Sequence, residues 1–251
     1  MRTPIIAGNW KLNKTVSEAV DLTSELAKLV DNITDVELVV APVFTALSNV
    51  YNVINTSNIQ LAAQDLYWED SGAFTGEVSA PMLKDVGCDY VIIGHSERRQ
   101  YFGETNETVN QKVKAALSHD LKPIICVGEL LKEREAGKTE AVIDDHVKGG
   151  IVDLTESEME SCVIAYEPVW AIGTGKTATP DQAQEVHSFI RDILTNCYSE
   201  NLSSQIRIQY GGSVKPENAA ELMSQQDVDG ALVGGASLDA QSFAEIVIQS
   251  R

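Results

Sequence analysis

Eight short apolar runs recur along the chain, each rich in β-branched or small residues and most ending in a polar residue or glycine. The runs are IIAGN (5–9), ELVVAP (37–42), IQLAAQ (59–64), YVIIGH (90–95), PIICVG (123–128), CVIAYE (162–167), IRIQYGG (206–212) and GALVGG (230–235). Continuous rather than alternating apolarity is typical of strands that are covered on both faces. The pattern therefore predicts eight buried strands.

Helical patterns occupy the stretches between these runs. Thr15 begins T-V-S-E, which is a capping-box signature, and Thr179 precedes a proline and has a glutamine three residues later. A further helix is expected to start at Thr105, and Pro216 and Ser237 are expected to open two more. Apolar residues at helical spacing after Thr15 predict one buried stripe, made of Val16, Ala19, Val20, Ala27 and Val30.

Eight strand–helix units in 251 residues predict an α/β fold with a parallel sheet. This number and size favour a single-domain (β/α)8 barrel over residues 1–251, and no Pro/Gly/Ser-rich linker divides the chain. A doubly wound open sheet is the alternative architecture.

The acidic composition narrows the choice of partners. The formal net charge of −18 makes nucleic acid and anionic membranes poor partners. No run approaches the roughly 20 apolar residues of a membrane span, and the N-terminus lacks a signal-peptide pattern, so we expect a cytoplasmic protein. The four cysteines are widely spaced and are expected to be reduced core thiols; they are Cys88, Cys126, Cys162 and Cys197.

Polar and glycine residues cluster at or just after the ends of the predicted strands. In a parallel barrel these ends converge on one face, where active sites are built. The sequence therefore predicts that one site contains Asn9, Lys11, Gln64, His95, Glu129, Glu167, Gly211–Gly212 and Gly234–Gly235.

Two of these residues suit proton transfer. Burial at a strand end would raise the pKa of Glu167 and make it a better base near neutral pH. His95 precedes the expected first turn of a helix, whose N-terminus disfavours a cation, so we expect a neutral imidazole that donates a hydrogen bond. Lys11 can stabilise a developing oxyanion.

Glycine pairs after the last two strands predict a phosphate site, because bare N–H groups at helix starts bind anions. The barrel rule places phosphate at the same strands. His119, His146 and His187 are interpreted as structural. With no second His or Cys at ligand spacing, we expect no metal site.

Two loops carry further expectations. Residues 168–178 contain GTGKT, but Trp170 stands where the first glycine of a P-loop would be, so a lid is the better interpretation. The predicted lid consists of Pro168, Val169, Trp170, Ala171, Ile172, Gly173, Thr174, Gly175, Lys176, Thr177 and Ala178. The long stretch 65–76 carries three aromatic residues and suggests a subunit contact.

The sequence resembles the triosephosphate isomerase family along essentially its whole length. The matching stretches are GNWKLN (8–13), SGAFTGEVS (71–79), GHSERR (94–99), AYEPVWAIGTGKTATP (165–180), YGGSV (210–214) and GALVGGASL (230–238). The resemblance implies a cofactor-free homodimeric enzyme of glycolysis and gluconeogenesis that interconverts two triose phosphates through an enediolate.

The resemblance also implies a role for each matching residue. Glu167 is expected to be the base and His95 the electrophile, with Asn9 and Lys11 binding the substrate oxyanion. Ser96 and Glu97 are expected to support them. The remaining implied contacts are with the phosphate, through Gly173, Ser213, Gly234 and Gly235, and with a second subunit, through Phe74, Thr75 and Gly76.

Three other functions stay open from the residues themselves. A Schiff-base aldolase would need a lysine at a mid-barrel strand end, where this chain has Glu167. A glycosidase could use Glu97 and Glu167 as its carboxylate pair. A non-catalytic protein on a barrel scaffold is the alternative of a different class, because fold alone does not establish function.

Overall fold

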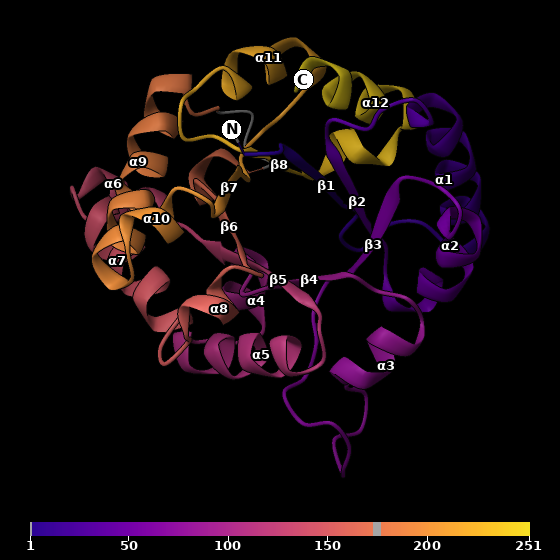
Figure 1. Ribbon diagram of the computed structural model, residues 1–251, viewed down its shortest axis with the longest axis horizontal. Coiled ribbons are helices and arrows are strands. Elements are labelled where there is room, and N and C mark those ends of the chain that lie inside the picture. Colours follow the sequence, from indigo (N-terminus) through magenta and orange to yellow (C-terminus); the bar gives the residue numbers. More distant parts are fainter. Residues whose placement is uncertain (1, 173–176) are drawn as a thin grey trace.

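Eight parallel strands form a closed barrel in the order of the chain, which confirms the predicted (β/α)8 architecture and excludes the open sheet (Figure 1). The computed structural model describes residues 2–172 and 177–251. The strands are β1 (Ile5–Asn9), β2 (Glu37–Ala41), β3 (Ile59–Ala63), β4 (Tyr90–Ile93), β5 (Lys122–Val127), β6 (Val163–Tyr166), β7 (Arg207–Tyr210) and β8 (Gly230–Val233).

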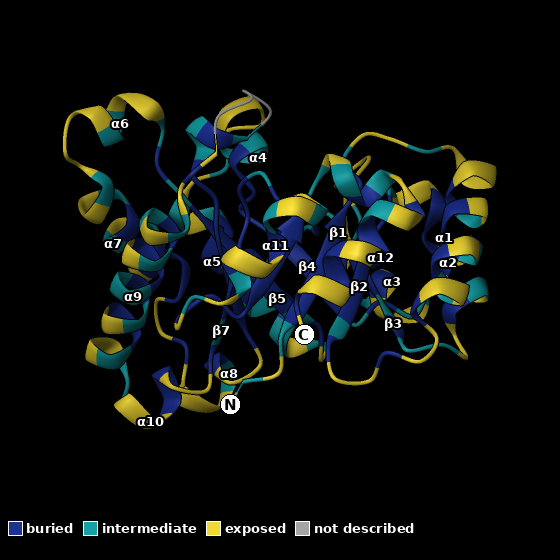
Figure 2. Ribbon diagram, turned by 90° about the horizontal axis from the view of Figure 1, so that it is seen from above, coloured by how far each residue is buried: buried dark blue, intermediate teal, exposed yellow. Residues whose placement is uncertain are grey.

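Helices surround the barrel on the outside (Figure 1). The apolar faces of the long helices pack against the strands and their polar faces meet solvent, so that the ribbon of helices such as α1 and α9 changes between buried and exposed (Figure 2). The α-helices are α1 (Val16–Val30), α2 (Leu47–Ile54), α3 (Ala80–Asp85), α4 (Ser96–Tyr101), α5 (Asn106–Ser118), α6 (Leu131–Glu135), α7 (Thr139–Gly150), α8 (Glu156–Met159), α9 (Pro180–Cys197), α10 (Glu200–Ser203), α11 (Pro216–Met223) and α12 (Ala240–Gln249). Three short 3-10 turns are η1 (Phe44–Ala46), η2 (Val169–Ala171) and η3 (Gly235–Leu238).

The predicted helix starts are confirmed at four positions and wrong at one. The Thr179 hydroxyl accepts a hydrogen bond from the Gln182 amide, and α9 begins at the next residue. Helices also begin after Thr15 and Thr105 and at Pro216. Ser237 does not open the last helix. It lies inside η3, and Asp239 caps α12 instead by accepting a hydrogen bond from the Ser242 amide.

The predicted buried stripe of α1 is also partly wrong. Val16 is exposed and Val20 is only partly buried, whereas Ala19 and Val30 lie in the core as expected. The residues that α1 buries are Ala19, Leu22, Thr23, Leu26 and Val30. A search for apolar residues misses Thr23 because it is polar. Its hydroxyl can be buried because it donates a hydrogen bond to the Ala19 carbonyl one turn earlier, at 2.7 Å.

The inside of the barrel is apolar along most of its length and is closed by charged groups at the N-terminal ends of the strands. There the Glu37 carboxylate accepts hydrogen bonds from Tyr90 Oη at 2.6 Å and Gln60 Nε2 at 2.7 Å, and it also pairs with Arg207. Burial raises the pKa of Glu37, but Tyr90 and Arg207 lower it to a net value below the ordinary one. This floor leaves only the opposite end of the barrel free for a ligand.

The connection between β3 and α3 extends away from the barrel (Figure 1). Its aromatic residues pack on each other: the Tyr67 ring lies 4.1 Å from the Trp68 ring and 4.7 Å from the Phe74 ring, centroid to centroid. Phe74, Thr75 and Gly76 at its tip are exposed. No helix within the described residues is long and apolar enough to cross a membrane.

His187 on α9 is a buried histidine whose protonation opposes folding. Its Nδ1 donates to the Asp227 carbonyl at 3.1 Å, and its ring meets the Tyr166 ring edge-on. Burial lowers the pKa of His187 to about 4. The unfolded state therefore binds more protons than the native state between about pH 6.5 and pH 4, and stability is lost as the pH falls through this window.

We expect His187→Gln to flatten the acid side of the stability curve. Lowering the pH from about 7 to about 5 should destabilise the wild type through this residue by about 2 kcal/mol, and the variant should lack that contribution. Urea unfolding at both pH values measures the difference. His146, whose pKa is also lowered by burial to about 4, provides a matched second variant, His146→Gln, with the same expected effect. Equal pH dependence in wild type and both variants would contradict the assignment.

Candidate active site

A cavity of about 660 Å³ opens at the C-terminal ends of the strands. Its lining brings together most of the residues that the sequence analysis placed at strand ends, which lie up to more than two hundred positions apart in the chain. They are Asn9, Lys11, His95, Glu167, Gly211, Gly212, Ser213, Gly234 and Gly235, with Ile172 and Leu232 adding apolar surface.

Glu167 and His95 form a direct pair in this cavity. His95 Nε2 lies 2.8 Å from Glu167 Oε1, and both side chains are almost fully buried. The second carboxylate oxygen, Oε2, accepts the Ser96 amide N–H at 2.9 Å. The predicted base is therefore held by the predicted electrophile and by the first residue of α4.

The backbone around Glu167 explains this placement. Glu167 follows the last residue of β6, and its amide donates to the Val127 carbonyl of β5 at 2.8 Å. A side-chain carbon at Gly128 would lie 1.8 Å from the Glu167 carbonyl, and one at Gly211 would lie 2.9 Å from Glu167 Cγ. Glycine on both neighbouring strands thus allows the carboxylate to fit between them.

The expected upward shift of the Glu167 pKa is wrong for this arrangement. Burial does raise the pKa, but the hydrogen bonds from His95 and from the Ser96 amide, together with the positive charge of Lys11, hold it below the ordinary value of a glutamate. Strand-end position alone showed the desolvation and not these three partners. In this structure Glu167 is an ionised carboxylate.

His95 is pulled in two directions. Burial lowers its pKa, and the neighbouring Glu167 carboxylate raises it above the ordinary value. A second proton would have to sit on Nδ1, but the Glu97 amide N–H already points at Nδ1, at 3.2 Å. The Glu97 amide therefore opposes a proton on Nδ1, while Nε2 faces the Glu167 carboxylate.

Lys11 reaches the cavity from an unusual backbone conformation. Its φ of +52° lies in the left-handed region, which a lysine seldom adopts, and Asn9 Oδ1 accepts its amide at 3.0 Å. Its ammonium group pairs with Glu97 at 2.6 Å. These fixed partners stabilise the strained backbone conformation of Lys11. They thereby hold its positive charge at the cavity of an otherwise acidic protein.

Gln64 has a role that the sequence analysis did not assign. Its Nε2 donates to the Lys11 carbonyl at 2.9 Å and to the Ala41 carbonyl at 2.8 Å. Gln64 thus ties the loop that carries Lys11 to the end of β2. The strand-end pattern marked Gln64 as a candidate, but nothing in its neighbours along the chain identified the loop that it binds.

The two glycine loops face the same cavity. Gly211, Gly212 and Ser213 follow β7, and Gly234 and Gly235 follow β8. A side-chain carbon at Gly212 would lie 2.2 Å from the Tyr210 hydroxyl oxygen, whereas one at Gly235 would meet nothing within 4 Å. The first loop is therefore tightly packed and the second is open to a ligand.

Glu129 does not line this cavity, although it was grouped with the site residues. Its Oε1 accepts hydrogen bonds from Trp170 Nε1 at 2.8 Å and from the Tyr166 hydroxyl at 3.1 Å, and it pairs with Arg134. Glu129 instead anchors the start of the predicted lid, where Pro168 to Ile172 include the turn η2. Gly173, Thr174, Gly175 and Lys176 lie outside the described residues.

The other histidines lie away from the cavity lining. His187 and His146 are structural groups on α9 and α7, and His119 pairs with Asp70 at 2.7 Å. Within residues 2–172 and 177–251, no group of three or more His, Cys, Asp or Glu side chains is arranged to hold a metal ion.

Comparison with known proteins identifies close relatives. A family model described as triosephosphate isomerase matches residues 4–250. Relatives include triosephosphate isomerases from Endomicrobium trichonymphae, 59% identical over 251 residues with 100% of both chains covered, and from Moorella thermoacetica, 61% identical over 247 residues with 98% of both chains covered. A crystal structure of triosephosphate isomerase from Bartonella henselae is 40% identical, has a TM-score of 0.90 and covers 98% of each chain.

The Glu167–His95 contact makes a prediction about the carboxylate. His95→Leu removes the hydrogen-bond donor and keeps the surroundings apolar, so burial is less opposed and the pKa of Glu167 should rise above that in the wild type. Carbon-13 NMR titration of labelled glutamate, with Glu167→Gln to assign the signal, measures it. An unchanged or lower midpoint in His95→Leu would show that His95 does not hold the carboxylate ionised.

Proposed function

The chain belongs to the triosephosphate isomerase family and is therefore an isomerase that interconverts dihydroxyacetone phosphate and D-glyceraldehyde 3-phosphate, and we propose that Glu167 and His95 carry its proton transfers. The reaction is a step of glycolysis and, in reverse, of gluconeogenesis. The observation that supports these roles is the 2.8 Å contact between a carboxylate and a ring nitrogen in a cavity edged by two glycine loops.

Glu167 acts as the base in this proposal. A hydrogen on a carbon next to a carbonyl is weakly acidic, so its removal needs a positioned base and stabilisation of the enediolate. In the structure both Glu167 oxygens are occupied by His95 and Ser96. When the substrate carbonyl takes the hydrogen of His95 Nε2, the carboxylate is released to accept the carbon-bound proton and return it to the neighbouring carbon.

His95, Asn9 and Lys11 stabilise the oxyanion that forms as this proton leaves. A neutral imidazole with its hydrogen on Nε2 can donate a proton to one substrate oxygen. It can then take up the proton of the other substrate oxygen, so that it moves protons between the two. Lys11 supplies a positive charge, and Asn9 holds the Lys11 backbone in place. Ser96 and Glu97 support the site by binding Glu167 and Lys11 respectively. The proposed steps need no cofactor and no metal.

The phosphate of the substrate binds at the glycine loops. Ser213, Gly234 and Gly235 line the cavity, and their main-chain N–H groups suit an anion. Gly173, outside the described residues, is proposed as a further ligand from the family resemblance. Binding energy from this unreactive group can fix the geometry of the reacting carbons.

We also propose that residues 168–178 cover the bound substrate. At the described ends of this segment, Ile172 lines the cavity and Trp170 is anchored to Glu129. A cover of this kind excludes water and protects the enediolate from losing its phosphate. The hydrogen bond at Trp170 lies where such a segment would pivot.

A homodimer is the proposed assembly. Beside the active site an open groove carries exposed apolar residues, among them Leu12 (94% exposed), Tyr101 (74%) and Phe102 (68%), and Lys11 and His95 lie along the same groove. The projecting loop ends in Phe74, Thr75 and Gly76, which are exposed. The loop of one copy inserted into the groove of another buries both surfaces and packs against the active-site loop of Lys11.

The location and domain organisation follow the same reasoning. We propose a cytoplasmic protein, because its triose phosphate substrates are intermediates of glycolysis. We also propose one catalytic domain for residues 1–251, because strands from both ends of the chain, β1 and β8, pair directly in the barrel.

Wild-type protein should interconvert the two triose phosphates in an assay that couples the product to oxidation of NADH. Glu167→Asp retracts the base by one methylene, and the rate should fall by about a hundredfold because proton transfer depends on sub-ångström placement. The matched control is Glu135→Asp on exposed α6, which should keep full activity. A Glu167→Asp enzyme as fast as the wild type would rule out Glu167 as the base.

Phe74→Glu should weaken the dimer. A charge at the tip of the loop must be buried in the apolar groove, which should raise the dimer dissociation constant by at least about thirtyfold. Light scattering after gel filtration at decreasing concentration gives the mass. Ile248→Glu on α12 replaces an equally exposed apolar residue away from the groove and should leave the mass unchanged. A variant that is dimeric over the same range as the control would overturn the proposed interface.

A further inference from the structure

The junction between β7 and β8 has the shortest backbone pairing in the barrel. A single residue pair, Tyr210 with Ala231, joins these strands, whereas four pairs join β6 to β7 and four join β1 to β8. These two strands lead directly into the two glycine loops of the cavity. The proposed phosphate site is thus built across the junction that the backbone holds least.

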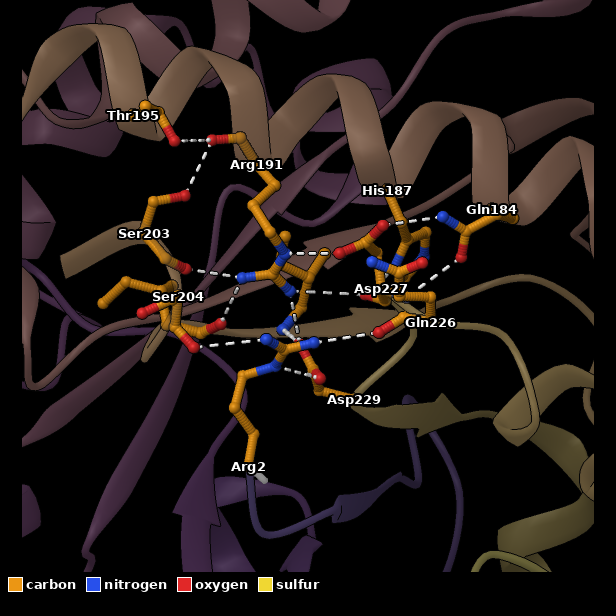
Figure 3. Close-up of polar contacts among 12 residues, drawn as sticks. Arg2, Gln184, His187, Arg191, Thr195, Ser203, Ser204, Gln226, Asp227 and Asp229 are labelled. Atoms are coloured by element: carbon orange, nitrogen blue, oxygen red, sulfur yellow. Dashed lines mark hydrogen bonds and ion pairs between the residues drawn. The ribbon is translucent and has the colours of Figure 1, made fainter. Parts of the chain in front are cut away.

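Side chains hold the lower end of this junction. The Ile208 amide donates to the Asp229 carboxylate at 2.9 Å, while the Asp229 amide donates to the Ile208 carbonyl at 2.8 Å. Arg191 of α9 pairs with the same carboxylate at 2.8 Å, and Arg2 approaches it from the N-terminal segment (Figure 3). The start of β8 is therefore fixed by a buried charge network rather than by a continuous strand ladder.

Gln209 holds the middle of the junction. Its side chain is fully buried, and its Nε2 donates to the Ala231 carbonyl of β8 at 3.3 Å and to the Ile5 carbonyl of β1 at 3.1 Å. Gly230 precedes Ala231 on β8, and a side-chain carbon there would lie 1.9 Å from the Ile5 carbonyl oxygen, so glycine lets β8 lie close to β1 at this level. One side chain thus connects β7 to the next two strands.

Burial of the Gln209 amide is energetically unfavourable, which suggests that the amide has a function. Its Oε1 is buried without a hydrogen-bond partner among the described residues, and an unsatisfied amide oxygen in an apolar interior is destabilising. An apolar residue of the same length would avoid this penalty. What such a residue could not do is link the carbonyls of two neighbouring strands.

Gln209 lies close enough to the two glycine loops to affect their relative position. It lies two residues before Gly211, and its acceptor Ala231 lies three residues before Gly234. A change in the separation of β7 and β8 at this level moves Ser213 relative to Gly234 and Gly235. Glu167 and His95 follow β6 and β4, and each of these strands is joined to β5 by four residue pairs.

We propose that Gln209 is a positioning residue for the substrate phosphate: its amide sets the distance between β7 and β8, and so between the two glycine loops. The inference rests on the proposed phosphate site. It predicts that loss of this amide weakens the interactions of the enzyme with the substrate phosphate and leaves the proton-transfer groups unchanged.

Gln209→Met keeps the length of the side chain and removes both hydrogen bonds. We expect kcat/KM for D-glyceraldehyde 3-phosphate to fall about tenfold, the equivalent of two ordinary hydrogen bonds, and inorganic phosphate to inhibit correspondingly less. With D-glyceraldehyde, which lacks the phosphate, kcat/KM measured by proton NMR should stay at the wild-type value. Ile124→Val, a conservative change at a buried position on β5, is the control that should leave the ratio of the two constants unchanged.

The ratio of the two constants decides between the outcomes. Equal losses on both substrates would show a merely structural role, and an unchanged ratio without any loss would show that the amide is dispensable; either result overturns the inference. If Gln209→Met does not fold, Gln209→Glu, whose neutral form retains one donor, decides by the same ratio, which should lie below that of the wild type. Wild-type protein without activity on the phosphorylated substrate would instead refute the proposed function.

Discussion

The contact between Glu167 and His95 is the interaction on which the rest of the site depends. A carboxylate buried in an apolar interior is normally unstable as an anion. Here the His95 ring and the Ser96 amide each take one of its oxygens, at 2.8 and 2.9 Å, and the charge persists. In the proposed mechanism the base is therefore stored in ionised form, held by donors that a substrate carbonyl displaces.

The barrel supplies the directions of these groups, and its overall charge limits the ways of binding an anion. With a net charge of −18, attraction of a triose phosphate cannot come from the surface as a whole. The site proposed here instead uses one lysine, held in a left-handed conformation by Asn9 and Gln64, and the main-chain amides of two glycine loops. In this proposal local dipoles replace a basic surface, and the accuracy of their placement depends on how β7 and β8 are joined.

The sequence predicted the barrel and most of the cavity because both follow from strand positions. Each of the eight apolar runs overlaps one observed strand, and most of the polar residues at their ends meet at one face. Prediction from the sequence failed where residues far apart in the chain determine the burial, the pKa or the direction of a side chain. The pKa of Glu167 is governed by residues some seventy positions away, Val16 and Val20 lie on the side of α1 that the barrel does not reach, and Glu129 turns toward Trp170 rather than into the cavity.

Nitrogen-15 NMR of the His95 ring tests the central claim most directly, because the claim concerns which ring nitrogen carries hydrogen. His95→Leu assigns the signals among the four histidines. At neutral pH the structure predicts one directly bonded hydrogen, on Nε2, and a bare Nδ1 that accepts the Glu97 amide. Two protonated nitrogens would mean a charged ring, and a neutral donor facing an ionised Glu167 would then be the wrong description of the resting site.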